Sequence, residues 1–183
     1  MLREKGVGQT RRLLEVLLEG ADEFPLNNAI PRNVQAVDSR LEGVCMRYEG
    51  SCHCGAIRLR LTLSWPPGEA PVRACDCSFC RAHGARTVTD PSGSVEIDLK
   101  DARTVHRYRF ALKTADYLIC GNCGVYVAAL ADTPKGLKST VNVNALNDHA
   151  LFDAHPPLVH YGEETAEARL SRRAERWTPT AIR

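Results

Sequence analysis

The sequence lacks long apolar runs and carries little excess charge. No apolar stretch approaches the roughly 20 residues that a membrane-spanning helix needs. A net charge of +2 and an aromatic content of 6% argue against a nucleic-acid partner, because such partners favour basic surfaces and stack their bases on aromatic side chains. The chain also opens without a signal peptide. We therefore expect a soluble, cytoplasmic protein that binds neither membranes nor nucleic acids.

Cysteine, by contrast, is frequent and clustered. Seven of the eight cysteines form three groups with the spacings CxC, CxCxxC and CxxC: Cys52 and Cys54; Cys75, Cys77 and Cys80; Cys120 and Cys123. Thiolates this close in sequence can converge on one ion, because the chain between them is a short turn. Gly55 and Gly124 follow the first and last groups and let the backbone turn tightly there. Sulfur ligands without a carboxylate cluster favour zinc.

Two other uses of cysteine fit this sequence less well. Disulfide frameworks usually serve secreted domains shorter than this chain. The cysteine spacings of plant-type and bacterial ferredoxins are absent, which argues against an iron–sulfur cluster. Metal-bound thiolates, which suit a reducing cytosol, remain the best interpretation.

Seven ligands divide naturally between a closed and an open metal site. A structural zinc has four protein ligands, whereas a catalytic zinc has three and keeps one position for water or substrate. The middle group can supply three ligands from one turn, which leaves the first and last pairs to close a four-thiolate site. The sequence leaves other pairings open, such as Cys52 and Cys54 with Cys75 and Cys77. It also leaves open an eighth ligand, Cys45 or His83, which would close both sites. We expect two zinc ions per chain.

The residues around these clusters resemble a known family. The motifs are GSCHCGA from residue 50, CDCSFCR from 75, CGNCG from 120 and VNVN from 141. From about residue 46 to about residue 150 the chain resembles the glutathione-dependent formaldehyde-activating enzyme family, which also includes centromere protein V. The resemblance implies a mainly β fold, with antiparallel sheets of the β-tent type around two zinc–cysteine sites. It also implies carbon–sulfur lyase chemistry on a thiol adduct.

The same resemblance implies a role for each cysteine group. A structural zinc would be held by the first and last pairs: Cys52, Cys54, Cys120 and Cys123. A second, exchangeable zinc would be held by the middle group: Cys75, Cys77 and Cys80. The concrete reaction is the formation of S-hydroxymethylglutathione from glutathione and formaldehyde, or its reversal.

Residue patterns divide the chain into three parts. Residues 1–45 contain leucines at helical spacing and then a stretch rich in proline and asparagine, so we expect an extension with a short helix and a loop or disordered linker. Residues 46–155 form the zinc domain. Residues 156–183 form a charged tail with one apolar helical face, which would cover the domain or meet a second subunit. That face consists of Ala166, Leu170, Ala174 and Trp177.

Alternation of apolar and polar residues predicts short antiparallel strands within the zinc domain. The clearest run, 57–63, places its apolar residues on one face: Ile57, Leu59, Leu61 and Leu63. Residues 95–99 repeat the pattern. In 105–112 the inward set would be Tyr108, Phe110 and Leu112, and a last strand would contain Val141, Val143 and Ala145.

The middle cluster also suggests catalytic residues. Zinc with three thiolates is a weak Lewis acid that suits a thiol ligand and keeps it ionised, and such a thiolate can add to an aldehyde carbon. We expect Cys75, Cys77 and Cys80 to serve this chemistry, with His83 as the nearest acid or base. Arg81 is the expected partner of a carboxylate on a glutathione-like thiol, and Arg73 and Arg86 also flank the cluster.

A rival function is a zinc-stabilised interaction module without turnover. Such a module needs no open coordination position, and a homo-oligomer is compatible with either function.

Overall fold

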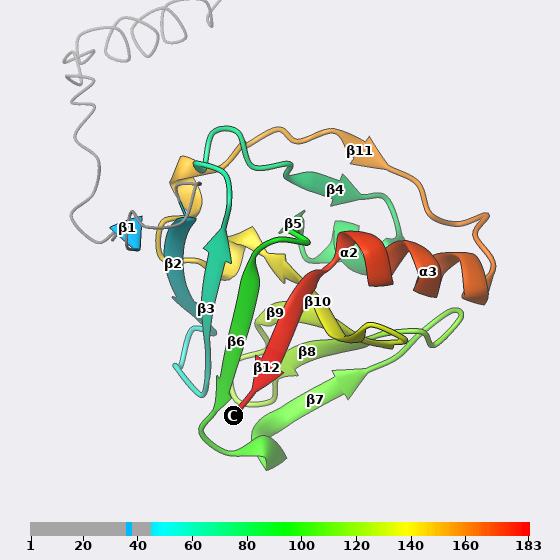
Figure 1. Cartoon of the computed structure of the whole chain (residues 1–183). Helices are drawn as coiled ribbons and strands as arrows, with labels where there is room; N and C mark the ends of the chain where they lie inside the picture. The colour runs from blue at the N-terminus through cyan, green and yellow to red at the C-terminus, as the bar shows by residue number, and fades with distance from the viewer. Residues whose placement is uncertain (1–35, 38–44) are drawn as a thin grey trace, which may run out of the picture. The chain divides into compact units, whose positions relative to one another are not determined.

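The computed structural model describes residues 36–37 and 45–183 (Figure 1). The expected N-terminal helix and most of the expected extension lie outside the described residues. The strands of the described part are β1 (Ala36–Val37), β2 (Cys45–Ser51), β3 (Ile57–Leu63), β4 (Arg73–Cys75), β5 (Arg86–Val88), β6 (Ser94–Leu99), β7 (Val105–Tyr108), β8 (Asp116–Cys120), β9 (Tyr126–Thr133), β10 (Gly136–Asn142), β11 (Leu158–Val159) and β12 (Thr178–Ile182). The helices are α2 (Ser78–Ala82), α3 (Ala166–Arg176) and the short 3-10 turns η1 (Ala102–Thr104), η2 (Val143–Ala145) and η3 (His149–Leu151).

The strands form two sheets that meet at β12. In the first sheet β1, β2, β3 and β6 are antiparallel neighbours, and β12 runs parallel to β6. In the second sheet β10 pairs antiparallel with β9, β5 and β12, while β7 and β8 extend it beyond β9. Residues 178–179 pair with β10 and residues 180–182 with β6, so one strand belongs to both sheets (Figure 1). The expected mainly β fold is confirmed.

The hydrophobic core lies where the two sheets face each other. The predicted inward set of β3 is at most 2% exposed, which confirms the period-two pattern: Ile57, Leu59, Leu61 and Leu63. Ile97 from β6 and Val141 from β10 are fully buried in the same cluster. β9 is buried on both faces from Tyr126 to Leu130, because sheet and helix cover it from opposite sides.

Two strand predictions are wrong in part. β7 ends at Tyr108, and the chain then turns through Ala111 and Lys113, whose φ angles are +50° and +53°. Tyr108, the last residue of β7, is 47% exposed, and Leu112, in the turn that follows, is 42% exposed. The last strand ends at Asn142, after which 143–145 form η2, although its apolar residues are buried as expected.

The C-terminal region contains the expected helix and two strands that the sequence analysis missed. Helix α3 begins after Thr165, whose side chain accepts a hydrogen bond from the Ala168 amide at 3.2 Å. It packs on β9 and β10. β11 runs parallel to β4, and β12 joins the two sheets. None of the described helices is long and apolar enough to cross a membrane.

Candidate functional site

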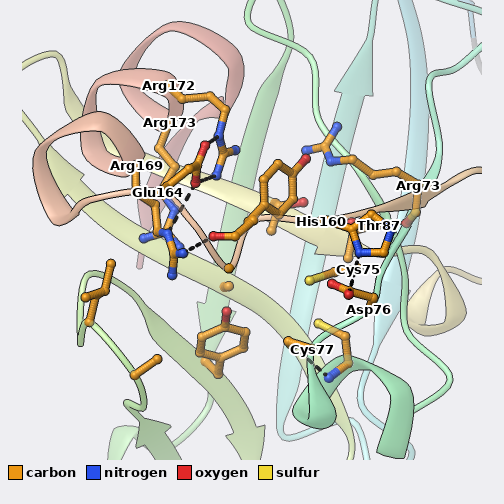
Figure 2. A pocket seen from close by; sticks show the side chains of 18 of the residues that line it. Arg73, Cys75, Asp76, Cys77, Thr87, His160, Glu164, Arg169, Arg172 and Arg173 are labelled. Atoms are coloured by element: carbon orange, nitrogen blue, oxygen red, sulfur yellow. Dashed lines mark hydrogen bonds and ion pairs between the residues drawn. The ribbon is translucent and has the colours of Figure 1, made fainter.

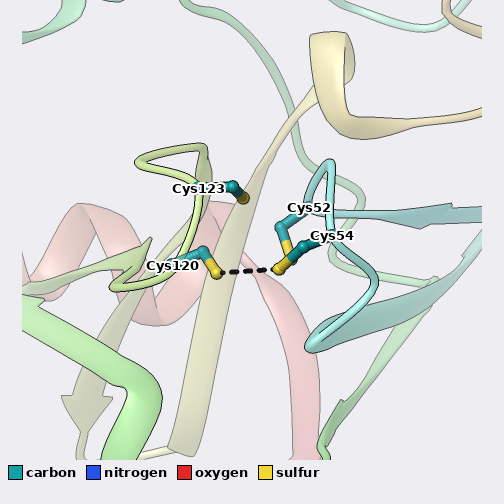
Figure 3. Close-up of side chains that lie close together, drawn as sticks. All are labelled: Cys52, Cys54, Cys120 and Cys123. Atoms are coloured by element: carbon teal, nitrogen blue, oxygen red, sulfur yellow. Dashed lines mark hydrogen bonds between the residues drawn. The ribbon is translucent and has the colours of Figure 1, made fainter.

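The first and last cysteine pairs converge on one point (Figure 3). Cys54 Sγ lies 3.6 Å from Cys52 Sγ and 3.5 Å from Cys120 Sγ, and with Cys123 all four Sγ atoms are within 4.8 Å of one another. A tetrahedral zinc with Zn–S bonds of about 2.3 Å places its sulfurs about 3.8 Å apart. The four thiols therefore have the spacing that a four-coordinate zinc requires.

Each pair of these four thiols lies in a tight turn, and the two turns are similar. Gly55 and Gly124 have φ angles of +71° and +74°, which glycine adopts without strain. The Gly55 amide donates to the Cys52 carbonyl at 3.0 Å, and the Gly124 amide donates to the Cys120 carbonyl at 2.8 Å. Each turn leads directly into a strand, β3 or β9. The glycine positions in the sequence thus predicted the local geometry correctly.

The middle cluster forms at the junction of β4 and α2. Cys75 ends β4, Cys77 caps α2 and accepts a hydrogen bond from the Cys80 amide at 3.4 Å, and Cys80 lies within α2. The three Sγ atoms lie within 4.8 Å of one another. All eight cysteines are free of disulfide bonds. Within the described chain neither Cys45 nor His83 joins either group.

Hydrogen bonding and burial shift the pKa values of the three thiols of the middle cluster in different directions. A hydrogen bond with Cys80 lowers the pKa of Cys75 to about 6. Burial raises the pKa of Cys77, while the hydrogen bond with Cys75 and burial raise that of Cys80. The protein alone therefore ionises one thiol readily and resists ionising the others. A soft divalent cation would stabilise all three thiols in their ionised form, and a set of three sulfur donors suits zinc.

The middle cluster lines a cavity of about 1020 Å³ (Figure 2). One wall comes from the loop between β7 and β8, together with Tyr117 and Tyr126. The opposite walls come from residues 160–164 and from α3. The four cysteines of the other cluster do not line this cavity. Only the three-thiol cluster is therefore reachable through it by a small molecule.

Two tyrosines of this wall carry neutral phenol groups. Burial, with a further contribution from nearby thiols, raises the pKa of both Tyr117 and Tyr126. Both phenols therefore keep their protons at neutral pH. Both side chains line the cavity.

A histidine that the sequence analysis missed stands beside the middle cluster. His160 Nδ1 lies 2.5 Å from Asp76 Oδ2 (Figure 2). The contact forms because β11 runs parallel to β4 and places Val159 opposite Cys75. The two residues are 84 positions apart, and no sequence pattern connects them.

The other expected residues occupy different places. His83 is exposed and outside the cavity lining, and its Nδ1 lies 2.9 Å from the Phe79 carbonyl oxygen. Arg81 is also exposed and outside the lining. Arg86 donates to Asn144 Oδ1 at 2.9 Å and to the Asp153 carbonyl at 2.8 Å. Arg73 lines the cavity. The functional roles of these residues stay predictions.

Three arginines of α3 also line the cavity, and the sequence analysis did not single them out. They are Arg169, Arg172 and Arg173. Their spacing of three and four residues places them on one helical face, which was the available signal. Arginines on an amphipathic helix usually face solvent. The sequence therefore could not show that these three line a cavity, and only the tertiary structure does.

Comparisons with known proteins found a family model, a related protein and a solved structure that are similar to this chain. A protein from Halomonas elongata named "Putative glutathione-dependent formaldehyde-activating enzyme" is 50% identical over 36 residues, which is 20% of this chain and 21% of that protein. The match thus spans about a fifth of that relative. A crystal structure of a Rhodobacter sphaeroides protein is 32% identical, with a TM-score of 0.47 over 61% of this chain and 99% of that one. The family model "Glutathione-dependent formaldehyde-activating enzyme" matches residues 47–161. Because this match covers more than half of the sequence, the chain belongs to the glutathione-dependent formaldehyde-activating enzyme family.

Proposed function

We propose that the protein is a carbon–sulfur lyase that acts on adducts of a small thiol and an aldehyde, such as S-hydroxymethylglutathione. One observation carries the proposal. Three thiols converge on the wall of a large cavity, whereas four converge in the cluster away from it. Three ligands leave one coordination position for a substrate, and four do not.

The two clusters would then have different tasks. Cys52, Cys54, Cys120 and Cys123 would hold a structural zinc that ties the sheets together. The middle group would hold the second zinc: Cys75, Cys77 and Cys80. When bound, that zinc would supply a positive charge that keeps a substrate thiol ionised at neutral pH.

Proton transfer is assigned to His160. Cleavage of the adduct turns its hydroxyl into a carbonyl, so the hydroxyl proton leaves while sulfur departs with the electrons of the C–S bond. Addition of the thiolate to the aldehyde is the reverse and returns one proton to the oxygen. Asp76 holds Nδ1 of His160 at 2.5 Å, which orients the ring and leaves Nε2 free for this proton. His83 has its Nδ1 against a backbone carbonyl and does not line the cavity, so His160 is better placed.

The aldehyde oxygen also needs a hydrogen-bond donor as charge develops on it. Tyr117 and Tyr126 line the cavity and stay neutral at physiological pH, because burial raises the pKa of both phenols. Each can donate to that oxygen. Phe110 and Ala129 add apolar surface to the same cavity.

The test combines a spectrum with a rate. Cobalt-substituted protein is titrated with cysteamine, and the visible spectrum reports whether a thiol enters the metal coordination. Exchange between formaldehyde and S-hydroxymethylglutathione is then followed by NMR with and without zinc-loaded protein. We expect a changed spectrum and faster exchange. An unchanged spectrum together with an unaltered exchange rate would contradict the proposal and favour the non-catalytic interaction module.

A further inference from the structure

One wall of the cavity is a short connecting segment that carries His160. Pairing between β11 and β4 ends at Val159, whose carbonyl accepts a hydrogen bond from the Asp76 amide at 3.1 Å. Helix α3 begins only at Ala166. Residues 160–164 therefore run along the cavity outside any helix or strand. Contacts other than regular secondary structure must hold this wall in place.

The contact between His160 and Asp76 is too exposed to orient the imidazole alone. The two side chains are 70% and 36% exposed. At such exposure water competes for the same groups and salt screens their charges, so the contact contributes little free energy. The position of the ring therefore depends on how firmly the backbone on either side of His160 is held.

Tyr161, directly after His160, is held by two arginines of α3. Arg169 Nη2 donates a hydrogen bond to the Tyr161 carbonyl. The guanidinium of Arg172 stacks on the Tyr161 ring, with its Cζ 3.9 Å from the ring centre. On the other side, β4 pairs with Val159. His160 thus lies between two anchored residues, one on the sheet and one on the helix.

Glu164 fixes both of these arginines. Arg172 Nε and Nη2 donate to its two carboxylate oxygens at 2.6 Å and 2.9 Å, and Arg169 Nε donates to it at 3.3 Å. The three side chains are between 13% and 24% exposed, so water competes less here than at His160. A bidentate contact between arginine and carboxylate also sets the orientation of both groups. Glu164 therefore determines where the two guanidiniums that contact Tyr161 stand.

Helix α3 is a firm support for this arrangement. It packs on β9 and β10. Arg173 ties it to the loop between β7 and β8, because its Nη1 donates to the Thr114 carbonyl at 2.7 Å and to the Thr114 hydroxyl at 2.8 Å. Figure 2 shows Glu164 among the α3 arginines and His160 beside Asp76, nearer the thiols. The wall that carries His160 is thus attached to an element that is itself attached to the rest of the cavity.

We propose that Glu164 is a positioning residue for His160: through Arg169 and Arg172 it holds residues 160–164 against α3 and so keeps the imidazole beside the three-thiol cluster. This inference rests on the proposed function for the role of His160 as proton acceptor. It adds a residue that acts through the wall and not on the reacting atoms. It also assigns Arg169 and Arg172 to the support of the wall, although both line the cavity.

The first test separates positioning from substrate binding. Glu164→Gln keeps the shape of the side chain and removes its charge. We expect kcat for thiol–aldehyde exchange to fall by roughly 10- to 100-fold, because the imidazole loses its fixed place, while KM changes by less than about twofold. If Arg169 and Arg172 instead bind an anionic substrate, the freed guanidiniums would lower KM and leave kcat unchanged, which would overturn the proposal.

The matched control is Glu175→Gln on the same helix. Glu175 forms an exposed ion pair with Lys135 at 2.7 Å and does not line the cavity, so its loss should leave kcat and KM unchanged. Arg172→Lys is the second variant, because it keeps the charge but loses the bidentate contact with Glu164. It should lower kcat as Glu164→Gln does, and it serves the test even if Glu164→Gln fails to fold.

A double variant shows whether Glu164 acts through His160. In a His160→Asn protein, Glu164→Gln should slow the remaining exchange by less than about twofold, because the ring that Glu164 positions is no longer there. A further loss of roughly 10- to 100-fold in that protein would show an effect on the cavity at large and would overturn the proposal. A normal kcat for both Glu164→Gln and Arg172→Lys would overturn it as well.

A spectroscopic measurement distinguishes failure of this inference from failure of the proposed function. Two-bond ¹H–¹⁵N NMR spectra of the zinc-loaded full-length protein at mildly alkaline pH report the tautomer of each histidine without any turnover, and His160→Asn assigns the signal. We expect His160 to have Nδ1 protonated in the parent and shifts averaged between two tautomers in Glu164→Gln. If the ring responds in this way but the parent catalyses no exchange, the positioning role stands and the lyase function is wrong. If the parent catalyses exchange and the ring signal is the same in both proteins, the positioning role is wrong and the function stands.

Discussion

The Sγ atoms of Cys54 and Cys120 lie 3.5 Å apart, although 66 positions separate the two residues in the sequence. Cys54 stands just before β3 of the first sheet, and Cys120 ends β8 of the second. A metal ion bound here would therefore tie one sheet to the other. Because the site does not exist in the unfolded chain, the free energy of metal binding adds to the free energy of folding.

Cys123→Ser should lower the melting temperature by roughly 10 °C or more, because a closed structural site loses one of its four thiolates. Cys77→Ser removes one thiolate from the middle cluster and is the matched comparison. It should cost less stability and abolish the cysteamine response of the cobalt spectrum. Thermal melting and metal content per chain measure both effects. Equal destabilisation by the two substitutions would contradict the division of tasks.

His160→Asn should slow thiol–aldehyde exchange by about 100- to 10,000-fold, because the proton of the adduct hydroxyl loses its acceptor. Binding of S-methylglutathione should change little. His155→Asn is the control on the same segment, since His155 does not line the cavity. His83→Asn tests the histidine that the sequence favoured. If His83→Asn slows the exchange and His160→Asn does not, the assignment of the proton acceptor is wrong.

Asp116→Asn should destabilise the protein at pH 7 by about 1.5–3 kcal/mol, as for a hydrogen bond to a charged group. The hydrogen bond from Arg109 lowers the pKa of Asp116 below its ordinary value of 3.8, with a further contribution from Arg107. A folded-state pKa below the unfolded one means that the stabilisation is complete above the unfolded pKa and disappears as pH falls through the folded pKa.

The difference in unfolding free energy between parent and Asp116→Asn should therefore be constant from pH 7 to about pH 5 and shrink below about pH 4. Denaturant unfolding of both proteins at each pH measures it. Arg109 and Asp116 flank the cavity loop between β7 and β8. The same variant should therefore also make that loop more susceptible to proteolysis. If the difference in unfolding free energy grows as the pH falls, the ion pair is not the cause of the destabilisation by Asp116→Asn.

Removal of residues 178–183 should prevent stable folding, because β12 pairs with β6 in one sheet and β10 in the other. Its Thr178 hydroxyl also accepts a hydrogen bond from the buried Asp90 amide at 2.8 Å. Circular dichroism and limited proteolysis measure the loss. Removal of Arg183 alone is the milder control, and a chain without β12 that melts like the parent would show that the strand is dispensable.

Local features of the fold were predictable from the sequence because they depend on neighbouring residues. The alternation in 57–63 predicted a half-buried strand, and the four apolar side chains are indeed buried. The same reasoning failed at Tyr108 and Leu112, because alternation does not reveal whether a partner covers the face. It also missed β12, whose sequence Thr-Pro-Thr-Ala-Ile becomes a strand only because β6 and β10 stand on either side of it.

By itself, the sequence determined the three cysteine groups, their tight turns and the mainly β character, since all of these follow from spacing and periodicity over a few residues. Only the tertiary structure decided which groups meet, and it brought His160 to Asp76 across 84 positions. It also decided which arginines of α3 face a cavity and which of them Glu164 neutralises. The physical reason is that coordination, proton transfer and charge pairing depend on distances in space, and strand pairing between remote segments sets those distances.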